Sequence, residues 1–401
     1  MTTQMNNRGI SANSGYVALA AEVTPGVPVR PITHYVPLTD ESMTTELNAN
    51  TELHVFGSKA ARLMTTPGMR SHGGDLTVLA EPNSTALFFS GLLPRTGITA
   101  NGDGTFTWEF NSKDFAPTST FTIDVSKGIS VTRFAGAEFG EISPSWKDGR
   151  QSWKVKTSAL KSFTGAVVAS VAGAVVTLEV APNKMKPTEL LAVGDTIGIL
   201  KADNSTVTGT VSSKTDATVT LGAAPAGVAA GDVLHLRPQP SVVLEDQPAF
   251  LWGRTEFCMG ATAAAAFAAT HTPVEDGSEY VLQHPFEDDK GTQSSGSFDP
   301  GMLVRSKSID ATLKIKNYFA DDRAAARYDR IAKSSIVVRS FSTDGQEFRL
   351  TLNNLACTKG GDKPLLKVDE ALFYEREYVP NYDRADGQML DIKVICKLSG
   401  L

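Results

Sequence analysis

The chain has 401 residues, of which 41% are hydrophobic and 20% charged, a composition that permits a large core and excludes a disordered protein. The net charge of −6 argues against broad, non-specific binding of nucleic acid, which requires a basic surface. No stretch approaches the ~20 apolar residues of a membrane helix, and residues 1–14 lack the apolar core of a secretory signal. Cys258, Cys357 and Cys396 are scattered, so we expect free thiols and synthesis in a reducing cytoplasm.

The first 164 residues predict a run of β-strands with one helix. Residues 1–14 are polar and indicate a flexible N-terminal segment. A short helix is expected over residues 83–93, capped by Asn83 or Ser84. The sequence Asn-Gly-Asp-Gly at 101–104 is a strong signal for a hairpin turn. Strands are expected at residues 105–110, 120–125, 129–134, 141–146 and 153–157.

Residues 165–240 differ from both flanks and predict an inserted, small all-β domain. They contain no Trp, Tyr or Phe, and their five basic and six acidic residues nearly balance. The sequence Val-Thr-Leu, followed by Ala-Pro and later by Gly-Asp, occurs twice. Such a duplication implies six short strands around one core, as in a small barrel or sandwich. We expect this domain to have close ends and a core of its own, so that the chain still folds without it.

Residues 241–401, like the first part, predict a run of β-strands interrupted by a helix. An apolar segment over 257–269 predicts a strand that runs into an alanine-rich turn or helix, and residues 284–301 form a long polar loop. A second helix is expected at about 321–333. Further strands are predicted at 308–316, 336–341, 347–352, 367–374 and 389–397. The chain thus divides into 1–164, 165–240 and 241–401, with the outer two parts forming one mainly β body.

No group of residues has the spacing of a catalytic or metal site. The six histidines are isolated, and no nucleophile elbow, phosphate-binding loop or dinucleotide fingerprint is present. We therefore expect no enzyme activity, no cofactor and no resident metal. The acidic run Glu287, Asp288 and Asp289 has oxygen ligands for calcium but lacks the spacing of known calcium loops, so a solvated contact loop is the preferred interpretation.

Three arginines, Arg323, Arg327 and Arg330, share one face of the second predicted helix. They could bind phosphate or carboxylates of a neighbour, or they could only balance the helix dipole together with the acidic residues at its start. Both interpretations stay open. These arginines and the acidic run are the candidate inter-subunit contacts.

Four segments in a fixed order carry a resemblance to a known family. Residues 15–29 place a strand before Glu-x-Thr-x-Gly-x-Pro, residues 35–43 follow it, residues 73–93 lead into a short helix, and residues 309–401 continue as strand, helix and strands. Together they resemble the major tail tube proteins of long-tailed bacteriophages. The resemblance covers about 1–160 and 241–401. The insert at 165–240 departs from simpler members, although decorating β domains are common in that family.

The resemblance implies a β-sandwich or barrel of the tail-tube type. It implies hexameric rings that stack into a tube, through which DNA passes from the capsid without specific binding. The implied partners are other copies of the chain and further tail proteins, such as the tape measure, terminator and distal tail proteins. The implied location is the virion tail, after synthesis in the bacterial cytoplasm.

Two other classes of function stay open on the sequence alone. One is another virion component: a baseplate protein, a capsid decoration or the tube of a contractile tail. The other is an adhesive or carbohydrate-binding β protein that uses the insert as its binding module. Sugar binding normally relies on aromatic platforms, and the absence of Trp, Tyr and Phe from 165–240 counts against that second class.

Overall fold

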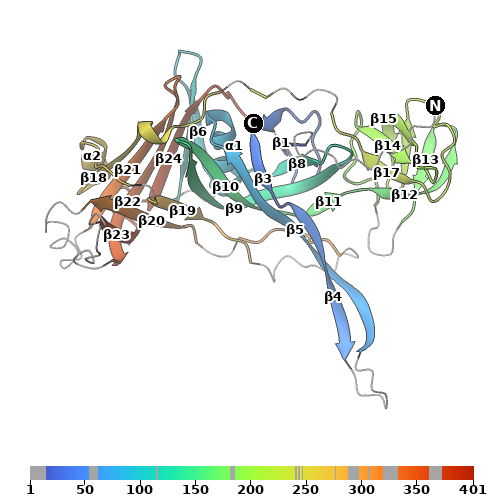
Figure 1. Ribbon diagram of the computed structural model, residues 1–401, viewed down its shortest axis with the longest axis horizontal. Helices are drawn as coiled ribbons and strands as arrows, with labels where there is room; N and C mark the ends of the chain where they lie inside the picture. The colour runs from blue at the N-terminus through green and yellow to red at the C-terminus, as the bar shows by residue number, and fades with distance from the viewer. Residues whose placement is uncertain are drawn as a thin grey trace.

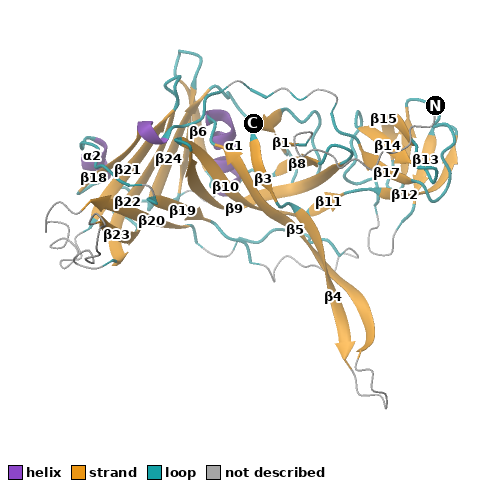
Figure 2. Cartoon of the chain, in the orientation of Figure 1, coloured by secondary structure: helices purple, strands orange, loops and turns teal. Residues whose placement is uncertain are grey.

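The computed structural model describes residues 15–53, 62–113, 116–180, 186–239, 242, 244–245, 247–275, 277–287, 298–305, 308–318, 333–360 and 373–401. It is mainly β, with 53% strand and 6% helix, which confirms the predicted fold class. Figures 1 and 2 show an elongated molecule in three parts. A two-sheet body lies at one end, a small barrel lies at the other, and a two-stranded ribbon projects from between them.

Two sheets face each other in the body, and a third leads to the barrel. The long sheet has the order β3 (Leu38–Glu41) and β4 (Thr44–Leu53), then β5 (Arg62–Leu79), β10 (Arg150–Ala159), β9 (Val131–Lys147), β19 (Glu279–Gln283), β20 (Asp310–Tyr318), β23 (Phe373–Val379) and β22 (Glu347–Lys359). The short sheet has the order β18 (Thr255–Gly260), β21 (Ser334–Phe341), β22, β24 (Leu390–Cys396), β7 (Phe106–Asn111) and β6 (Arg95–Ala100). The barrel-side sheet contains β2 (His34–Val36), β1 (Tyr16–Ala21), β8 (Phe121–Ser126), the first half of β9 and β11 (Lys161–Phe163).

Two strands, β9 and β22, each belong to two sheets. The first half of β9 pairs with β8 in the barrel-side sheet, and its second half pairs with β10 and β19 in the long sheet. The first half of β22 pairs with β21 and β24, and its second half with β23. Asn354 has φ +51° where β22 changes sheets. Irregular residues of this kind let one strand turn a corner between packed sheets.

The helix α1 (Pro82–Leu92) fills the core of the body, and all its residues are buried. The ring of Phe89 lies 5.5 Å from that of Trp153 and 5.3 Å from that of Phe348. The helix confirms the prediction for residues 83–93, but the predicted cap is wrong. The N-cap is Glu81, and Pro82 occupies the first helical turn, where its missing N–H needs no partner. The Asn83 side chain instead bonds outward, for example by accepting from the Lys397 backbone N–H.

The insert contains a closed six-stranded barrel. Its strands are β12 (Ala166–Ala172), β13 (Val175–Leu178), β14 (Thr196–Leu200), β15 (Thr206–Lys214), β16 (Thr218–Leu221) and β17 (Val233–Leu236). They pair antiparallel in the cyclic order β12–β13–β16–β15–β14–β17 and back to β12. If β12, β13 and β14 are exchanged with β15, β16 and β17, in that order, every strand pairing of the barrel is preserved. The barrel therefore has internal two-fold pseudosymmetry, as expected of a duplicated unit.

The duplicated Gly-Asp turns repeat the same hydrogen bonds. Gly194 and Gly231 have φ of +90° and +92°, a region that strongly favours glycine. In the first turn, Asp195 accepts from the N–H three residues before it at 2.7 Å. In the second, Asp232 accepts from the equivalent N–H at 2.8 Å. The two turns have the same internal geometry, so a difference in their contribution to stability arises from the residues that each turn contacts.

Most other predicted elements coincide with described strands. The turn at 101–104 joins β6 to β7, and the strands expected near 308, 336, 347 and 389 are β20, β21, β22 and β24. The alanine-rich segment forms the short helix α2 (Ala263–Phe267), capped by the Thr262 hydroxyl. The helix predicted at 321–333 lies outside the described residues except for Lys333. The three cysteines are free thiols, as predicted.

Candidate interaction surfaces

The strands β4 and β5 form a hairpin arm that leaves the long sheet. β5 pairs with β10 from Leu79 to His72, whereas its pairing with β4 continues outward to Arg62. In the described part of the chain, β4 has no strand on its other edge. Free backbone N–H and C=O groups along a strand edge are a template for pairing with another chain. Figure 1 shows the arm extending well beyond the body.

A buried polar cluster lies at the root of the arm, where β5 parts from β10. The Thr45 hydroxyl lies 3.1 Å from Nδ1 of His72 and 2.6 Å from the Ser162 hydroxyl. Nε2 of His72 lies 3.1 Å from the carboxylate of Asp299. The order of carboxylate, imidazole and hydroxyl is that of a catalytic triad, with the His72 side chain fully buried and the Thr45 hydroxyl also in contact with that of Ser162. The cluster links the arm to β11 and to the segment at 298–305.

A crevice of about 800 Å³ opens beside this root, between the arm and the barrel. Its apolar wall is formed by side chains from both parts, including Met43, Leu47, Ala166, Val167, Pro187 and Val233. Hydroxyl groups of Thr45, Thr132, Ser162 and Thr164 also line it. Of the two cations among its described lining residues, Arg70 lies 3.7 Å from Asp299, and Lys127 lies 3.1 Å from Glu41. The crevice thus combines apolar walls, hydroxyl groups and two described cations that each lie near a carboxylate.

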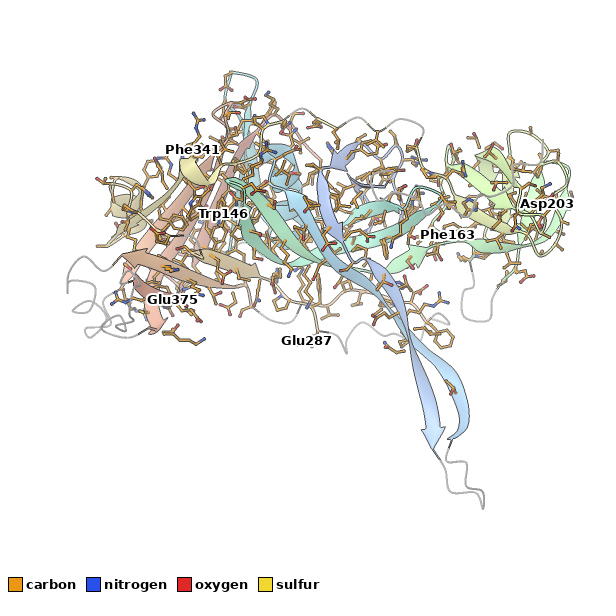
Figure 3. All side chains as sticks on the ribbon, in the orientation of Figure 1. Trp146, Phe163, Asp203, Glu287, Phe341 and Glu375 are labelled. Atoms are coloured by element: carbon orange, nitrogen blue, oxygen red, sulfur yellow. The ribbon has the colours of Figure 1, made fainter. Side chains whose placement is uncertain are left out.

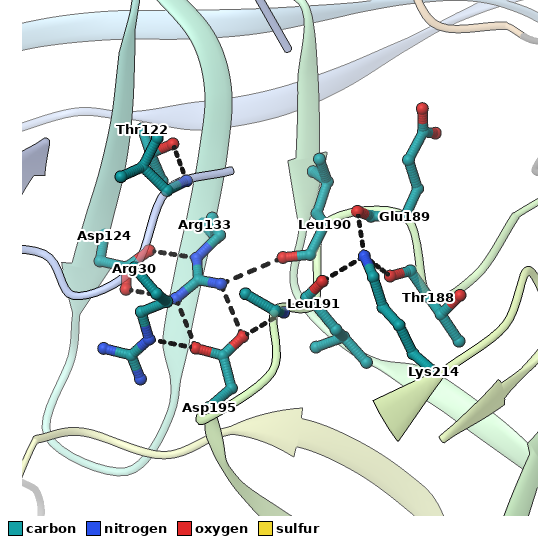
Figure 4. A network of polar contacts seen from close by, with 12 residues as sticks. Arg30, Thr122, Asp124, Arg133, Thr188, Glu189, Leu190, Leu191, Asp195 and Lys214 are labelled. Carbon is teal, nitrogen blue, oxygen red and sulfur yellow. Dashed lines mark hydrogen bonds and ion pairs between the residues drawn. The ribbon is translucent and has the colours of Figure 1, made fainter. Parts of the chain in front are cut away.

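The barrel is held to the body by a buried ion network (Figure 4). Arg133 of β9 contacts Asp124 of β8 at 2.7 and 2.9 Å, and Asp195 of the first Gly-Asp turn at 2.7 and 3.0 Å. Arg30 adds a contact to Asp195 at 2.5 Å. The two carboxylates raise the pKa of Arg133 above its usual value despite the opposing effect of burial. A buried guanidinium with paired carboxylates is strongly directional, so the network fixes the orientation of the first turn.

Carbonyl groups of the neighbouring turn at 188–191 also bind cations. Lys214 Nζ donates to the carbonyls of Thr188 at 3.1 Å and of Glu189 at 2.9 Å, and also to that of Leu191. Arg133 donates to the carbonyl of Leu190 at 3.1 Å. All four carbonyls of the turn therefore have a charged donor. The docked end of the barrel is rigidly tied to the body and to its own strand β15.

The barrel shares its hydrophobic core with the body, and this corrects the expectation that the insert has a core of its own. One buried cluster joins barrel residues such as Leu191 and Ile197 to Tyr16, Val131 and Phe163 of the barrel-side sheet. Figure 3 shows Phe163 at the junction of the two parts, and Asp203 at the far end of the barrel. The sheet of the insert closes on itself as a barrel, but its hydrophobic core continues into the barrel-side sheet of the body.

The outer face of the long sheet is polar and carries charges of both signs. Outward side chains of β10, β9, β19, β20, β23 and β22 include Lys154, Lys156, Glu141, Glu279, Asp310, Lys314, Lys316, Glu375, Glu377 and Lys359. Lys314 and Glu375 pair at 3.0 Å, and so do Lys359 and Glu377. Charges compensated in this way give little attraction for a polyanion.

Of the six predicted contact residues, only Glu287 is among the residues that the structure describes. Glu287 lies on the lower side of the body in Figure 3, and its backbone N–H donates to the carbonyl of Val304 at 3.0 Å. Asp288, Asp289, Arg323, Arg327 and Arg330 lie outside the described residues. Sequence reasoning missed the residues that the structure does bring together, Arg133 with Asp195 and His72 with Asp299. The signal available for the first pair was the repeated Gly-Asp turn, together with a charge within the apolar strand at 129–134.

Comparison with known proteins gives no family assignment. In the described ranges, no three His, Cys, Asp or Glu side chains gather in a way that could hold a metal ion. The described helices are all too short or too polar to cross a bilayer. No protein-family model matches the chain, and no curated protein matches it either.

Proposed function

We propose that the chain is a structural subunit of a bacteriophage tail tube, which assembles into hexameric rings that stack around a channel for DNA. The observation that supports this proposal best is the hairpin arm with its free edges. A long two-stranded ribbon with no sheet partner in the described chain is an aggregation hazard in a monomer. Pairing with other copies of the chain in a closed, head-to-tail ring removes that hazard.

The end of the short sheet supports the same proposal. β6 pairs with β7 on one side, and in the described structure its other edge has no strand. In the described structure the body therefore presents free strand edges at β4 of the long sheet and at both ends of the short sheet, β6 and β18. Free edges on different strands suit a heterologous contact, in which one edge of a subunit meets a different edge of the next.

The long sheet suits the wall of a DNA channel. Its outer face combines lysines and carboxylates that pair with each other, as Lys314 does with Glu375. Such a face neither attracts nor strongly repels a passing duplex. In this proposal the barrel lies on the outside of the tube, the chain acts structurally rather than as an enzyme, and its partners are its own copies and the other tail proteins.

Negative-stain electron microscopy of the purified protein tests the proposal. We expect stacked rings or tubes at high protein concentration. A variant in which a short Gly-Ser turn replaces residues 48–67 should keep the circular dichroism spectrum of the wild type but form no tubes. An insertion of similar size in the exposed loop at 222–231 of the barrel is the matched control and should leave the tubes intact. Monomers or closed shells from the wild-type chain under all conditions would contradict the proposal.

A further inference from the structure

The polar cluster at the root of the arm has the geometry of an activated hydroxyl group. The Asp299 carboxylate lies 3.1 Å from Nε2 of His72, and Nδ1 of His72 lies 3.1 Å from the Thr45 hydroxyl. Both contacts are within hydrogen-bond reach, which is the first requirement for a nucleophile and its general base. Thr45 and His72 are direct strand partners on β4 and β5, so their side chains share one face of the arm root.

The contacts of His72 fix the direction in which protons are shared. An ionised carboxylate only accepts hydrogen bonds, so Nε2 of a neutral His72 carries the hydrogen that Asp299 accepts. Nδ1 is then the acceptor nitrogen of the ring, and the Thr45 hydroxyl donates to it. Because this contact uses the one hydrogen of the Thr45 hydroxyl, the Ser162 hydroxyl is the donor in the contact of 2.6 Å between them. Thr45 is therefore the group whose proton His72 can remove.

The Thr45 hydroxyl is accessible although its base is not. The His72 side chain is fully buried, whereas Thr45 is half-buried and lines the crevice of about 800 Å³. A general base has to contact the nucleophile and not the solvent, so a buried imidazole behind an accessible hydroxyl meets that condition. Exclusion of water also strengthens the electrostatic interaction between His72 and Asp299.

The lining of the crevice defines the class of compound that Thr45 would attack. Leu47, Val167 and Val233 on its walls are 48%, 36% and 38% exposed, so they can contact a short apolar chain. Arg70 also lines the crevice and lies two residues before His72 on β5. Alternation along the strand places Arg70 on the same face as His72, where a cation can stabilise the negative charge of an attacked carbonyl group.

We propose that Thr45 is a nucleophile that carboxylic esters or thioesters with a short apolar acyl chain modify covalently. The Thr45 oxygen bonds to the carbonyl carbon, and the bond from that carbon to the alcohol oxygen or thiol sulfur of the donor breaks. The proton passes from Thr45 to Nδ1 of His72 and then to the leaving group, so the products are an acylated Thr45 and a free alcohol or thiol. The step needs one donor per chain and no turnover. It therefore goes beyond the structural role proposed above and does not depend on it.

Incubation of the folded full-length protein with p-nitrophenyl butyrate, followed by peptide mass spectrometry, tests this proposal. We expect a butyryl group on Thr45, formed at least about a hundredfold more slowly in His72→Gln, which is the scale of general-base catalysis. Thr45→Val should remove the accompanying burst of p-nitrophenolate. Thr44→Val is the matched control, because Thr44 also lines the crevice but is paired with Gly73, and it should leave the rate unchanged.

The position of the butyryl group and the folding of the variants make the test decisive. Circular dichroism and urea denaturation show whether each variant folds as the wild type does. Asp299→Asn should also slow the reaction, because the amide no longer holds the hydrogen of His72 on Nε2. A folded His72→Gln variant that reacts as fast as the wild type would overturn the proposal. An absence of butyryl-Thr45 in the wild type, or acylation of Ser162 in its place, would overturn it whatever the variants do.

Discussion

Arg133 and Asp195 lie 62 positions apart in the chain and form a two-pronged contact at 2.7 and 3.0 Å, with side chains only 1% and 0% exposed. They join the body to the first of two equivalent turns in the barrel. The second turn has the same internal geometry but no guanidinium among its described contacts. This difference makes Asp232 a natural control for Asp195.

We predict that Asp195→Asn lowers the free energy of unfolding by about 3 kcal/mol or more, because it leaves a buried guanidinium only partly neutralised. Asp232→Asn should lower it by about 1 kcal/mol, the usual effect of weakening backbone hydrogen bonds. Urea denaturation of both variants checks the prediction. Equal losses would show that the contact with Arg133 adds nothing to the turn itself.

Removing the barrel should destabilise the body. Deletion of residues 166–236 with a short bridging linker exposes Tyr16, Val131 and Phe163, which are buried in the shared core. Exposed apolar patches of this kind cause aggregation, so we expect an insoluble product. Adding Val131→Thr and Phe163→Ser to the deletion should raise the soluble fraction. A deletion variant that is already as soluble as the full chain would refute the structural role of the junction.

Glu347 should make the body sensitive to acid. Burial alone would raise its pKa, but hydrogen bonds from Arg349 and Arg339 outweigh burial and hold the pKa below its ordinary value of 4.5. Because the folded-state pKa is the lower one, the stabilisation is fully present above pH 4.5 and is lost as the pH falls through the folded-state value.

We therefore expect Glu347→Gln to lower the free energy of unfolding by about 2 kcal/mol at pH 7, the scale of hydrogen bonds to a charged group. The difference from the wild type should shrink below pH 4.5. Denaturation curves at several pH values measure it. Glu256→Gln is the control, since Glu256 contacts Arg339 at 3.4 Å with a 42% exposed side chain and should have little effect. A difference independent of pH would argue against the ion pairs.

Gly91 should not tolerate alanine, although alanine favours helices. A Cβ atom there would lie 2.4 Å from the ring of Phe139 and 3.1 Å from that of Phe121, and both rings are fully buried. We expect Gly91→Ala to destabilise the protein by about 1–3 kcal/mol through overpacking. Gly97→Ala in β6 is the control, because no described atom lies within 4 Å of the added group. Thermal melting distinguishes the two, and a stabilised Gly91→Ala variant would contradict the packing.

The sequence predicted local elements well because each has a local cause. Alternating apolar residues produced the strands, the Asn-Gly-Asp-Gly turn produced the β6–β7 hairpin, and the repeated Gly-Asp turns predicted the duplicated barrel strands. The arm was not predicted, because β4 and β5 carry no turn or alternation signal that separates an arm from an ordinary hairpin. The buried pairs of Arg133 with Asp195 and of His72 with Asp299 depend on tertiary contacts across 62 and 227 positions, which spacing along one chain cannot reveal.

The pseudosymmetry of the barrel has a practical consequence. The turn at 187–195 is fastened to the body, whereas its counterpart at 222–231 consists of glycine, alanine, proline and valine and is mostly exposed. Of the two equivalent turns of the barrel, one attaches the barrel to the body and the other is a loop exposed to solvent. A foreign peptide spliced into that loop would be displayed on the outside of the molecule, far from the joint on which the rest of the fold depends.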